Sequence, residues 1–260
     1  MINYTSFTQQ QLIKLAKQKT REVFSPEEQH LRSYTFENPP HKRKYIHFSA
    51  LHYFESAIIT PDMITSLQNN ATLLSVGSGE GHLERLLKDG FHIPTKNITT
   101  SDLYEDPKIE HAKFPHYTFD MTKPWPNFNQ QFDYILFPES FGVALIDWEN
   151  IGNPTNQSRT HRFFNELDKT EKEILAGNLN PQHLNFFMQV VGMDVSRVHR
   201  IYQVLQQAIP HLKPHGEIRI KHGIDEPQQR AYIMAKLAQE YQNISFPTQS
   251  GSYENFVVKL

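Results

Sequence analysis

Three closely spaced glycines between two apolar segments constrain the fold of this chain more than any other feature. Residues 72–90 read Thr-Leu-Leu-Ser-Val-Gly-Ser-Gly-Glu-Gly-His-Leu-Glu-Arg-Leu-Leu-Lys-Asp-Gly. The apolar run at 73–76 is typical of a strand buried on both faces, and the leucines after the loop recur at helical spacing. Because glycine has no side chain, it lets the backbone turn tightly and approach a ligand closely. The segment predicts a strand, a glycine turn and a helix that ends at Gly90, a C-cap glycine.

The spacing of the glycines decides between nucleotide-binding motifs. A dinucleotide fingerprint, G-x-G-x-x-G/A, would need a small residue at position 82, which is His82. No Gly-Lys-Ser/Thr sequence follows the loop, so a phosphate-binding P-loop is excluded. What remains is G-x-G-x-G, from Gly77 to Gly81.

Acidic residues follow the next two predicted strands. Asp102 ends the β-prone run 97–101 and lies 102 − 81 = 21 residues beyond Gly81. At this distance a second parallel strand would present a carboxylate to the two hydroxyls of a ribose; the alternative is a surface aspartate that closes a strand. Asp120 falls at the end of a third predicted strand at 116–121, and a fourth is predicted at 131–139.

Four features of the chain resemble the motifs of the class I (Rossmann-like, seven-stranded) S-adenosylmethionine-dependent methyltransferases. They are the G-x-G-x-G loop, the acids after strands two and three, Phe-Asp-Tyr-Ile-Leu at 132–136 and Leu-Lys-Pro-His-Gly at 212–216. The resemblance covers residues 71–260. It implies an α/β fold with a doubly wound, mostly parallel sheet of order 3-2-1-4-5-7-6, in which strand 7 is antiparallel. Residues 244–246 and 256–258 are predicted to supply the closing pair of strands. The chain departs from the pattern at Ser75, where the family usually has an acid, and at His215, which replaces a glycine.

Two helical segments lie outside this pattern. Residues 1–70 predict an N-terminal helical extension, with helices at 8–24, from Ser25-Pro26, at 45–59 and from Thr60-Pro61, and we expect it to cover the active site. Residues 71–260 form the predicted methyltransferase core, with a helical insertion after strand 4 at about 141–195. The insertion is expected to cover the substrate; a pair of core helices or a dimer contact is the alternative.

The resemblance also implies a cofactor, S-adenosyl-L-methionine, with S-adenosyl-L-homocysteine as its product. The cofactor-binding residues it implies are Gly77, Ser78, Gly79, Glu80, Gly81, Asp102, Leu103, Asp120, Met121 and Phe137. Methyl transfer is an in-line displacement that needs no protein nucleophile, but a base must take a proton from a hydroxyl or a protonated nitrogen. Glu139 and His161 are the candidate catalytic residues, and either can instead be an ordinary surface or structural residue. No metal site is predicted.

The composition of the chain limits the kinds of molecule that it is expected to bind. The net charge of −2 gives no general attraction to nucleic acid or anionic membrane, and the absence of cysteine excludes disulfides and thiolate nucleophiles. No apolar run reaches the length of a membrane span, and no secretory signal precedes the first predicted helix, so we expect a cytoplasmic protein. The expected partner is a small-molecule substrate, with no membrane and nucleic acid disfavoured. The sequence leaves the oligomeric state open, a homodimer included.

The sequence therefore predicts a methyltransferase (EC 2.1.1.-) that moves a methyl group from S-adenosylmethionine to an O or N atom of a small or medium-sized acceptor. One alternative is a protein or RNA methyltransferase, for which the basic run at 41–44 would be a docking patch. Another is a non-catalytic protein of the same fold that binds a ligand or serves as a partner subunit.

Overall fold

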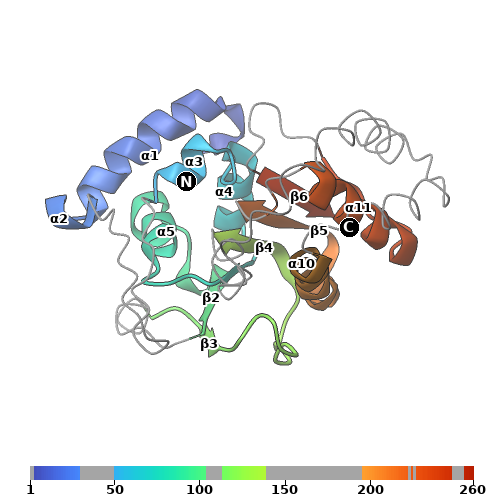
Figure 1. The fold of residues 1–260 in the computed structure, drawn as a ribbon. Coiled ribbons are helices and arrows are strands. Elements are labelled where there is room, and N and C mark those ends of the chain that lie inside the picture. The colour runs from blue at the N-terminus through green and yellow to red at the C-terminus, as the bar shows by residue number, and fades with distance from the viewer. Residues whose placement is uncertain are drawn as a thin grey trace, which may run out of the picture.

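The computed structural model describes residues 3–29, 50–103, 113–138, 195–221, 224, 227–247 and 255–260. Figure 1 shows these elements around one sheet. In chain order they are η1 (Tyr4–Ser6), α1 (Gln9–Val23), α2 (Pro26–Gln29), α3 (His52–Glu55), α4 (Pro61–Gln68), β1 (Leu73–Val76), α5 (His82–Arg85), the π-helical turn η2 (Leu86–Gly90), η3 (Thr95–Asn97), β2 (Ile98–Asp102), β3 (His116–Thr118), β4 (Phe132–Pro138), α10 (Val195–Ala208), η6 (Ile209–His211), β5 (Leu212–Lys221), α11 (Pro227–Glu240) and β6 (Asn255–Lys259).

The sheet confirms the predicted α/β class and most of the predicted strand order. Its order is β3-β2-β1-β4-β5-β6; every neighbouring pair is parallel except β5 and β6, which are antiparallel. β6 therefore takes the place and direction predicted for strand 7.

The strand predicted at 244–246 is reduced in the described residues to an isolated antiparallel bridge between Ser245 and Lys259. Pro247 follows at once and has no N–H to continue a ladder, which explains why pairing stops there.

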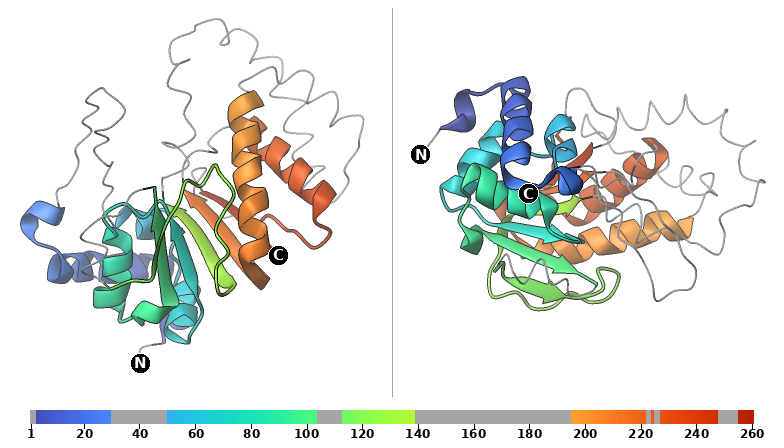
Figure 2. Two further views of the ribbon diagram at one scale, coloured as in Figure 1. Left: turned by 90° about the horizontal axis from the view of Figure 1, so that it is seen from below. Right: turned by 90° about the vertical axis from the view of Figure 1, so that its left-hand side faces the viewer.

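Helices cover both faces of the sheet, because alternate side chains of the central strands point to opposite faces. Leu73 of β1 and Ile98 of β2 are buried with α1, α3, α4 and α5 on one face. Leu74 of β1 and Ile135 of β4 are buried on the other face with α10 and α11. Figure 2 shows the two helical layers on either side of the strands.

The N-terminal helices begin as the sequence predicts. Thr8 caps α1 in a capping box with Gln11, and Thr60 caps α4, whose first residue is Pro61. Of the helix predicted at 45–59, the described part is helical only at α3 and residues 45–49 lie outside the described residues.

The helical segment ends at Gly90, as predicted, but its C-cap is Phe91, so the prediction that Gly90 is the C-cap is wrong. Among the described glycines only Gly77, Gly79 and Gly81 have positive φ, and here it is His92, two residues further on, that has a φ of 56°. Gly90 is needed for space: a Cβ atom there would lie 2.9 Å from Leu86 Cδ1 and 3.1 Å from Lys19 Cβ. The absence of a side chain lets α1 pack closely on η2.

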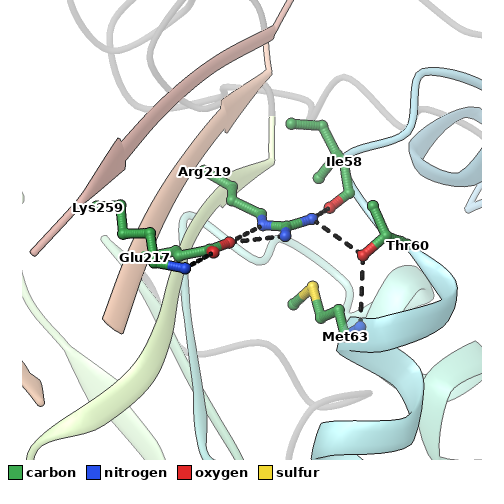
Figure 3. Close-up of polar contacts among 6 residues, drawn as sticks. All are labelled: Ile58, Thr60, Met63, Glu217, Arg219 and Lys259. Atoms are coloured by element: carbon green, nitrogen blue, oxygen red, sulfur yellow. Dashed lines mark hydrogen bonds and ion pairs between the residues drawn. The ribbon is translucent and has the colours of Figure 1, made fainter. Parts of the chain in front are cut away.

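Charged side chains of β5 hold α3 and α4 on the sheet. Arg219 donates from Nη1 to the carbonyl oxygen of Ile58 (2.7 Å) and, at 3.5 Å, to Oγ1 of Thr60, which caps α4 (Figure 3). Its Nε and Nη2 both donate to Glu217 Oε2, and Lys259 of β6 donates to Glu217 Oε1. These bonds satisfy the buried guanidinium and link the N-terminal segment to the far half of the sheet.

An irregular stretch opens β5. Phe132 of β4 pairs with Leu212 but Tyr134 pairs with Glu217, so β5 carries extra residues at this point. His215 there has a φ of 68°, the left-handed conformation that suits the glycine it replaces in the family pattern. The departure at this position is thus tolerated by the backbone at some cost in strain.

Candidate functional site

The glycine loop leaves the carboxyl end of β1 and is held by the end of β2. The N–H groups of Gly77 (2.7 Å) and Ser78 (2.9 Å) both donate to the carbonyl oxygen of Ser101. Gly77, Gly79 and Gly81 have φ angles of 76°, 55° and 69°, which other residues adopt only with strain. The loop therefore depends on these three glycines for its shape.

Asp102 fastens the middle of the loop. Its Oδ2 accepts the N–H of Gly79 at 2.8 Å, and its Oδ1 accepts the N–H of Leu103 at 2.7 Å. The structure thus joins the two motifs that the sequence separates by 21 residues, Gly81 to Asp102 (102 − 81).

A second carboxylate belongs to Glu84 of α5, the helix that follows the loop. Glu84 of α5 is 1% exposed and Ser75 of β1 is fully buried on the face that α5 covers. Among the described residues, neither oxygen of Glu84 nor Oγ of Ser75 has a hydrogen-bond partner. Burial raises the pKa of the Glu84 carboxyl to about 7; the nearby Ser75 hydroxyl and the backbone amide of Glu84 oppose this rise, and the charge of Asp102 adds to it.

The other predicted cofactor residues differ in their surroundings. Leu103 follows Asp102 and is 39% exposed, the one large apolar side chain so exposed in the described part of the chain. Asp120 uses Oδ1 to accept the N–H and the hydroxyl of Thr122. Met121 and Phe137 are buried in the core on the α10 face. Cofactor contact by each of these residues stays a prediction.

Glu80 of the loop lies beside His82, the first residue of α5. The two side chains are mostly buried, with His82 Nε2 3.8 Å from Glu80 Oε2. On the other side, the ring of His82 meets the ring of Phe24 edge to face at a centroid distance of 5.5 Å. The start of α5 is therefore tied both to the loop and to the N-terminal segment.

Both candidate catalytic residues, Glu139 and His161, and the predicted insertion at about 141–195, apart from its last residue, lie outside the described residues. Glu139 follows Pro138, the last residue of β4. The described ranges contain no group of three His, Asp or Glu side chains that could hold a metal ion. No helix in these ranges is both long and apolar enough to cross a membrane.

Sequence reasoning missed Glu84. The leucines at 83, 86 and 87 indicate which side of the helix is apolar, and Glu84 lies at the margin of that side, where an acid normally reaches water. The signal that could have found it is its place in the first turn after a short glycine loop, because such a loop brings that turn close to the end of β1.

Comparison with known proteins gives similarities in structure only. No protein-family model and no curated protein matches the sequence. Among solved structures, DesVI from Streptomyces venezuelae is 14% identical over 64% of this chain and 49% of its own, with a TM-score of 0.34. TrmN from Thermus thermophilus is 14% identical over 81% of this chain and 52% of its own, with a TM-score of 0.39.

A third structure is that of the N-methyltransferase NodS from Bradyrhizobium japonicum WM9 in complex with S-adenosyl-L-homocysteine. It is 10% identical over 76% of this chain and 85% of its own, with a TM-score of 0.36. This chain matches about half the length of DesVI and of TrmN. At such identities and TM-scores, the fold of this chain rests on its own strand order.

Proposed function

We propose that this chain is an S-adenosylmethionine-dependent methyltransferase (EC 2.1.1.-) that transfers a methyl group to an O or N atom of a small or medium-sized acceptor. The observation that carries the proposal is the bond between the glycine loop after β1 and the carboxylate of Asp102 at the end of β2. In the order β3-β2-β1-β4-β5, the strand order reverses between β1 and β4. Ligands of doubly wound sheets bind at that point, outside the carboxyl ends of the strands.

The residues at this edge fit the parts of the donor. A carboxylate such as that of Asp102 is a strong acceptor for a hydroxyl pair, and the two hydroxyls of the ribose are such a pair. The exposed side chain of Leu103 offers an apolar surface beside them for the adenine ring. The left-handed glycines bring backbone rather than side chains toward the rest of the ligand.

The reaction makes modest demands on the protein. S-adenosylmethionine supplies, when bound, a methyl group activated by a positively charged sulfur. The task of the chain is then to hold donor and acceptor in line, and Asp102 and the loop fix one of the two partners. We propose Glu139 as the group that takes the proton from the acceptor, because it directly follows β4 at the same edge.

The N-terminal segment lies close enough to the site to support its proposed role as a cover. Arg85 of α5 donates from Nη1 to Glu28 of α2 at 2.8 Å, and its guanidinium lies 5.0 Å from the centre of the Phe24 ring. α2 is thereby held against the helix that follows the glycine loop. We propose that the N-terminal segment covers the active site.

Calorimetric titration with S-adenosylmethionine and S-adenosylhomocysteine tests the proposal. We expect micromolar binding that is lost in Gly79→Arg, which puts a large side chain at a left-handed position, and reduced at least about tenfold in Asp102→Ala. Asp89→Ala is the matched control, since Asp89 is an exposed acid at the far end of the same helical segment. Circular dichroism of each variant shows whether the fold is kept.

The outcomes separate the alternatives. No binding to the folded wild-type chain contradicts the proposal. Binding without turnover in a screen of hydroxyl and amine acceptors favours a non-catalytic ligand-binding protein. An RNA methyltransferase would instead show acceptor binding that weakens steeply with salt, because each phosphate contact releases counterions.

A further inference from the structure

Glu84 and Ser75 form a buried polar pair that the fold leaves unsatisfied. Glu84 is 1% exposed, Ser75 is not exposed at all, and neither side chain has a hydrogen-bond partner among the described residues. Buried polar groups are nearly always hydrogen-bonded, because burying one without a partner costs free energy. Packing alone therefore does not explain why a carboxyl group is buried at this position.

The charges around Glu84 do not supply that reason. Charged or titratable groups near Glu84 in the chain include Glu80, His82, Arg85 and Asp102. Arg85 is paired with Glu28 at 2.8 Å, and His82 lies beside Glu80. Asp102 is the one charged group of the described chain that acts on the pKa of Glu84, and it raises that pKa because both groups are acids. No cation of the described chain compensates Glu84.

The position of the pair points to a ligand. Ser75 precedes Gly77 by two residues and Glu84 follows Gly81 by three, so the two residues flank the loop in the chain. Asp102, which fastens that loop, is close enough for its charge to act on Glu84. In a site of low dielectric, an uncompensated carboxylate attracts a positive charge more strongly than it would in water. A ligand seated on the loop would bring its charge close to this group.

We propose that Glu84 is the counter-charge for the cationic amino-acid part of the donor, protonated in the free protein and ionised when the donor is bound. The inference rests on the proposed function, since S-adenosylmethionine carries both an ammonium and a sulfonium group. On binding, the O–H bond of the Glu84 carboxyl breaks, the proton passes to the buffer, and the electron pair stays on the carboxylate. Ser75 donates its hydroxyl hydrogen to the ionised form. Glu84 is in this sense a positioning residue for the donor, distinct from Asp102, which serves the ribose.

Three ligands separate the possible sources of the charge. S-adenosylmethionine has an ammonium and a sulfonium group, S-adenosylhomocysteine has the ammonium alone, and adenosine has neither. Proton release with the first two but not with adenosine assigns the ammonium, and release with S-adenosylmethionine alone assigns the sulfonium. Equal proton release with adenosine would overturn the proposal.

The experiment is calorimetry in buffers of different ionisation enthalpy, which counts protons released on binding. With the pKa of Glu84 at about 7 in the free protein, we expect about half a proton to be released from Glu84 at pH 7 and more at pH 6. The affinity for S-adenosylmethionine should rise with pH up to about 7.5, because only the ionised form of Glu84 binds the cation, and fall again above about pH 8, where the ammonium group of the ligand loses its own proton.

Glu84→Gln keeps the shape of the side chain but cannot ionise. We expect it to abolish proton release and to lower the affinity for S-adenosylmethionine at least about tenfold at pH 8, while adenosine binds as tightly as to the wild type. Asp102→Ala should lower the affinity for all three ligands. Unchanged affinity and unchanged proton release in Glu84→Gln would overturn the inference.

A second variant tests whether Glu84→Gln lowers the affinity by removing the charge or only by disturbing the local structure. Ser75→Asp combined with Glu84→Gln moves the carboxylate to the other member of the same buried pair. We expect it to restore proton release and at least part of the lost affinity; failure to restore either, in a folded protein, counts against a counter-charge role. If the wild type binds none of the three ligands, the proposed function fails; if it binds S-adenosylmethionine without proton release, only the role of Glu84 fails.

Discussion

At the scale of single residues, two carboxylates with opposite surroundings share this site. Asp102 accepts two backbone N–H groups, which stabilise its charge, while Glu84 has no hydrogen-bond partner among the described residues and is fully buried. The first was predictable from its distance to the glycines. The second was not, because leucine spacing reports the apolar side of a helix and says little about an acid at its margin.

The raised pKa of Glu84 makes the stability of the ligand-free protein depend on pH. In the unfolded chain the group titrates near its model value of 4.5, whereas in the folded protein it titrates at about 7. Between these values the folded state holds the proton more tightly, so its contribution to stability is full below 4.5 and is lost as pH rises to 7.

We expect Glu84→Gln to be more stable than the wild type at pH 8 by about 3 kcal/mol, and to differ little from it at pH 5. Urea unfolding of both proteins at the two pH values measures the difference. Asp89→Asn, which changes an exposed acid, should show no such dependence. A wild-type stability that is flat between pH 5 and pH 8 would contradict the assigned burial.

His215 allows a second prediction at this scale. Its φ of 68° costs a non-glycine residue about 1 kcal/mol, and its side chain is exposed. We therefore expect His215→Gly to raise the free energy of unfolding by up to about 1 kcal/mol. His215→Ala is the control, because alanine removes the imidazole but keeps the strain. If both variants behave alike, backbone strain is not the cause.

At the scale of elements, the residue at which a helix starts was easier to predict from the sequence than the distant residues that the helix contacts. The helix starts predicted at Thr8 and at Thr60-Pro61 were confirmed, and the structure shows Thr8 and Thr60 as the N-caps of α1 and α4. The long-range bonds of Arg219 to Ile58 had no sequence signal, because the two residues lie 161 positions apart. The strand predicted at 244–246, the sixth of the predicted sheet, is reduced to one bridge in the described residues because Pro247 follows it.

The bonds of Arg219 should carry much of the attachment between β5 and the N-terminal helices. Arg219→Met leaves the partly buried Glu217 with one partner fewer and removes the buried donor of the Ile58 carbonyl oxygen, so we expect a loss of about 3 kcal/mol in the free energy of unfolding. Lys259→Met removes the more exposed partner of the same glutamate and should cost less than about 1 kcal/mol. Equal losses in urea unfolding would contradict this ranking.

At the scale of the whole molecule, the described N-terminal residues share one core with the sheet. Tyr4, Leu12, Phe54 and Ile58 are buried together with Leu73 of β1. A sequence reading naturally separates these residues as an extension, because they precede the first recognisable motif. Whether they also cover the donor stays a prediction.

Removal of residues 1–59 should therefore prevent folding rather than merely open the site. The deletion exposes one apolar face of the sheet and of α4 to water. We expect the truncated chain to show no cooperative thermal transition and to bind a hydrophobic dye, while a deletion of residues 1–2 behaves as the wild type. A cooperative transition in the chain that begins at residue 60 would mean that the N-terminal helices are a separable appendage.

The two faces of the sheet also differ in when their residues leave the ribosome. The described members of the α1 face all come from residues 4–136, whereas the α10 face draws on residues as late as Val258. During synthesis, the first face thus has its whole apolar complement available while the second is still being made. Arg219, translated later, then bonds to Ile58 and ties the last strands onto a half that can already have collapsed. The order in which the residues are synthesised thus matches the order in which the two faces of the sheet acquire their described apolar residues.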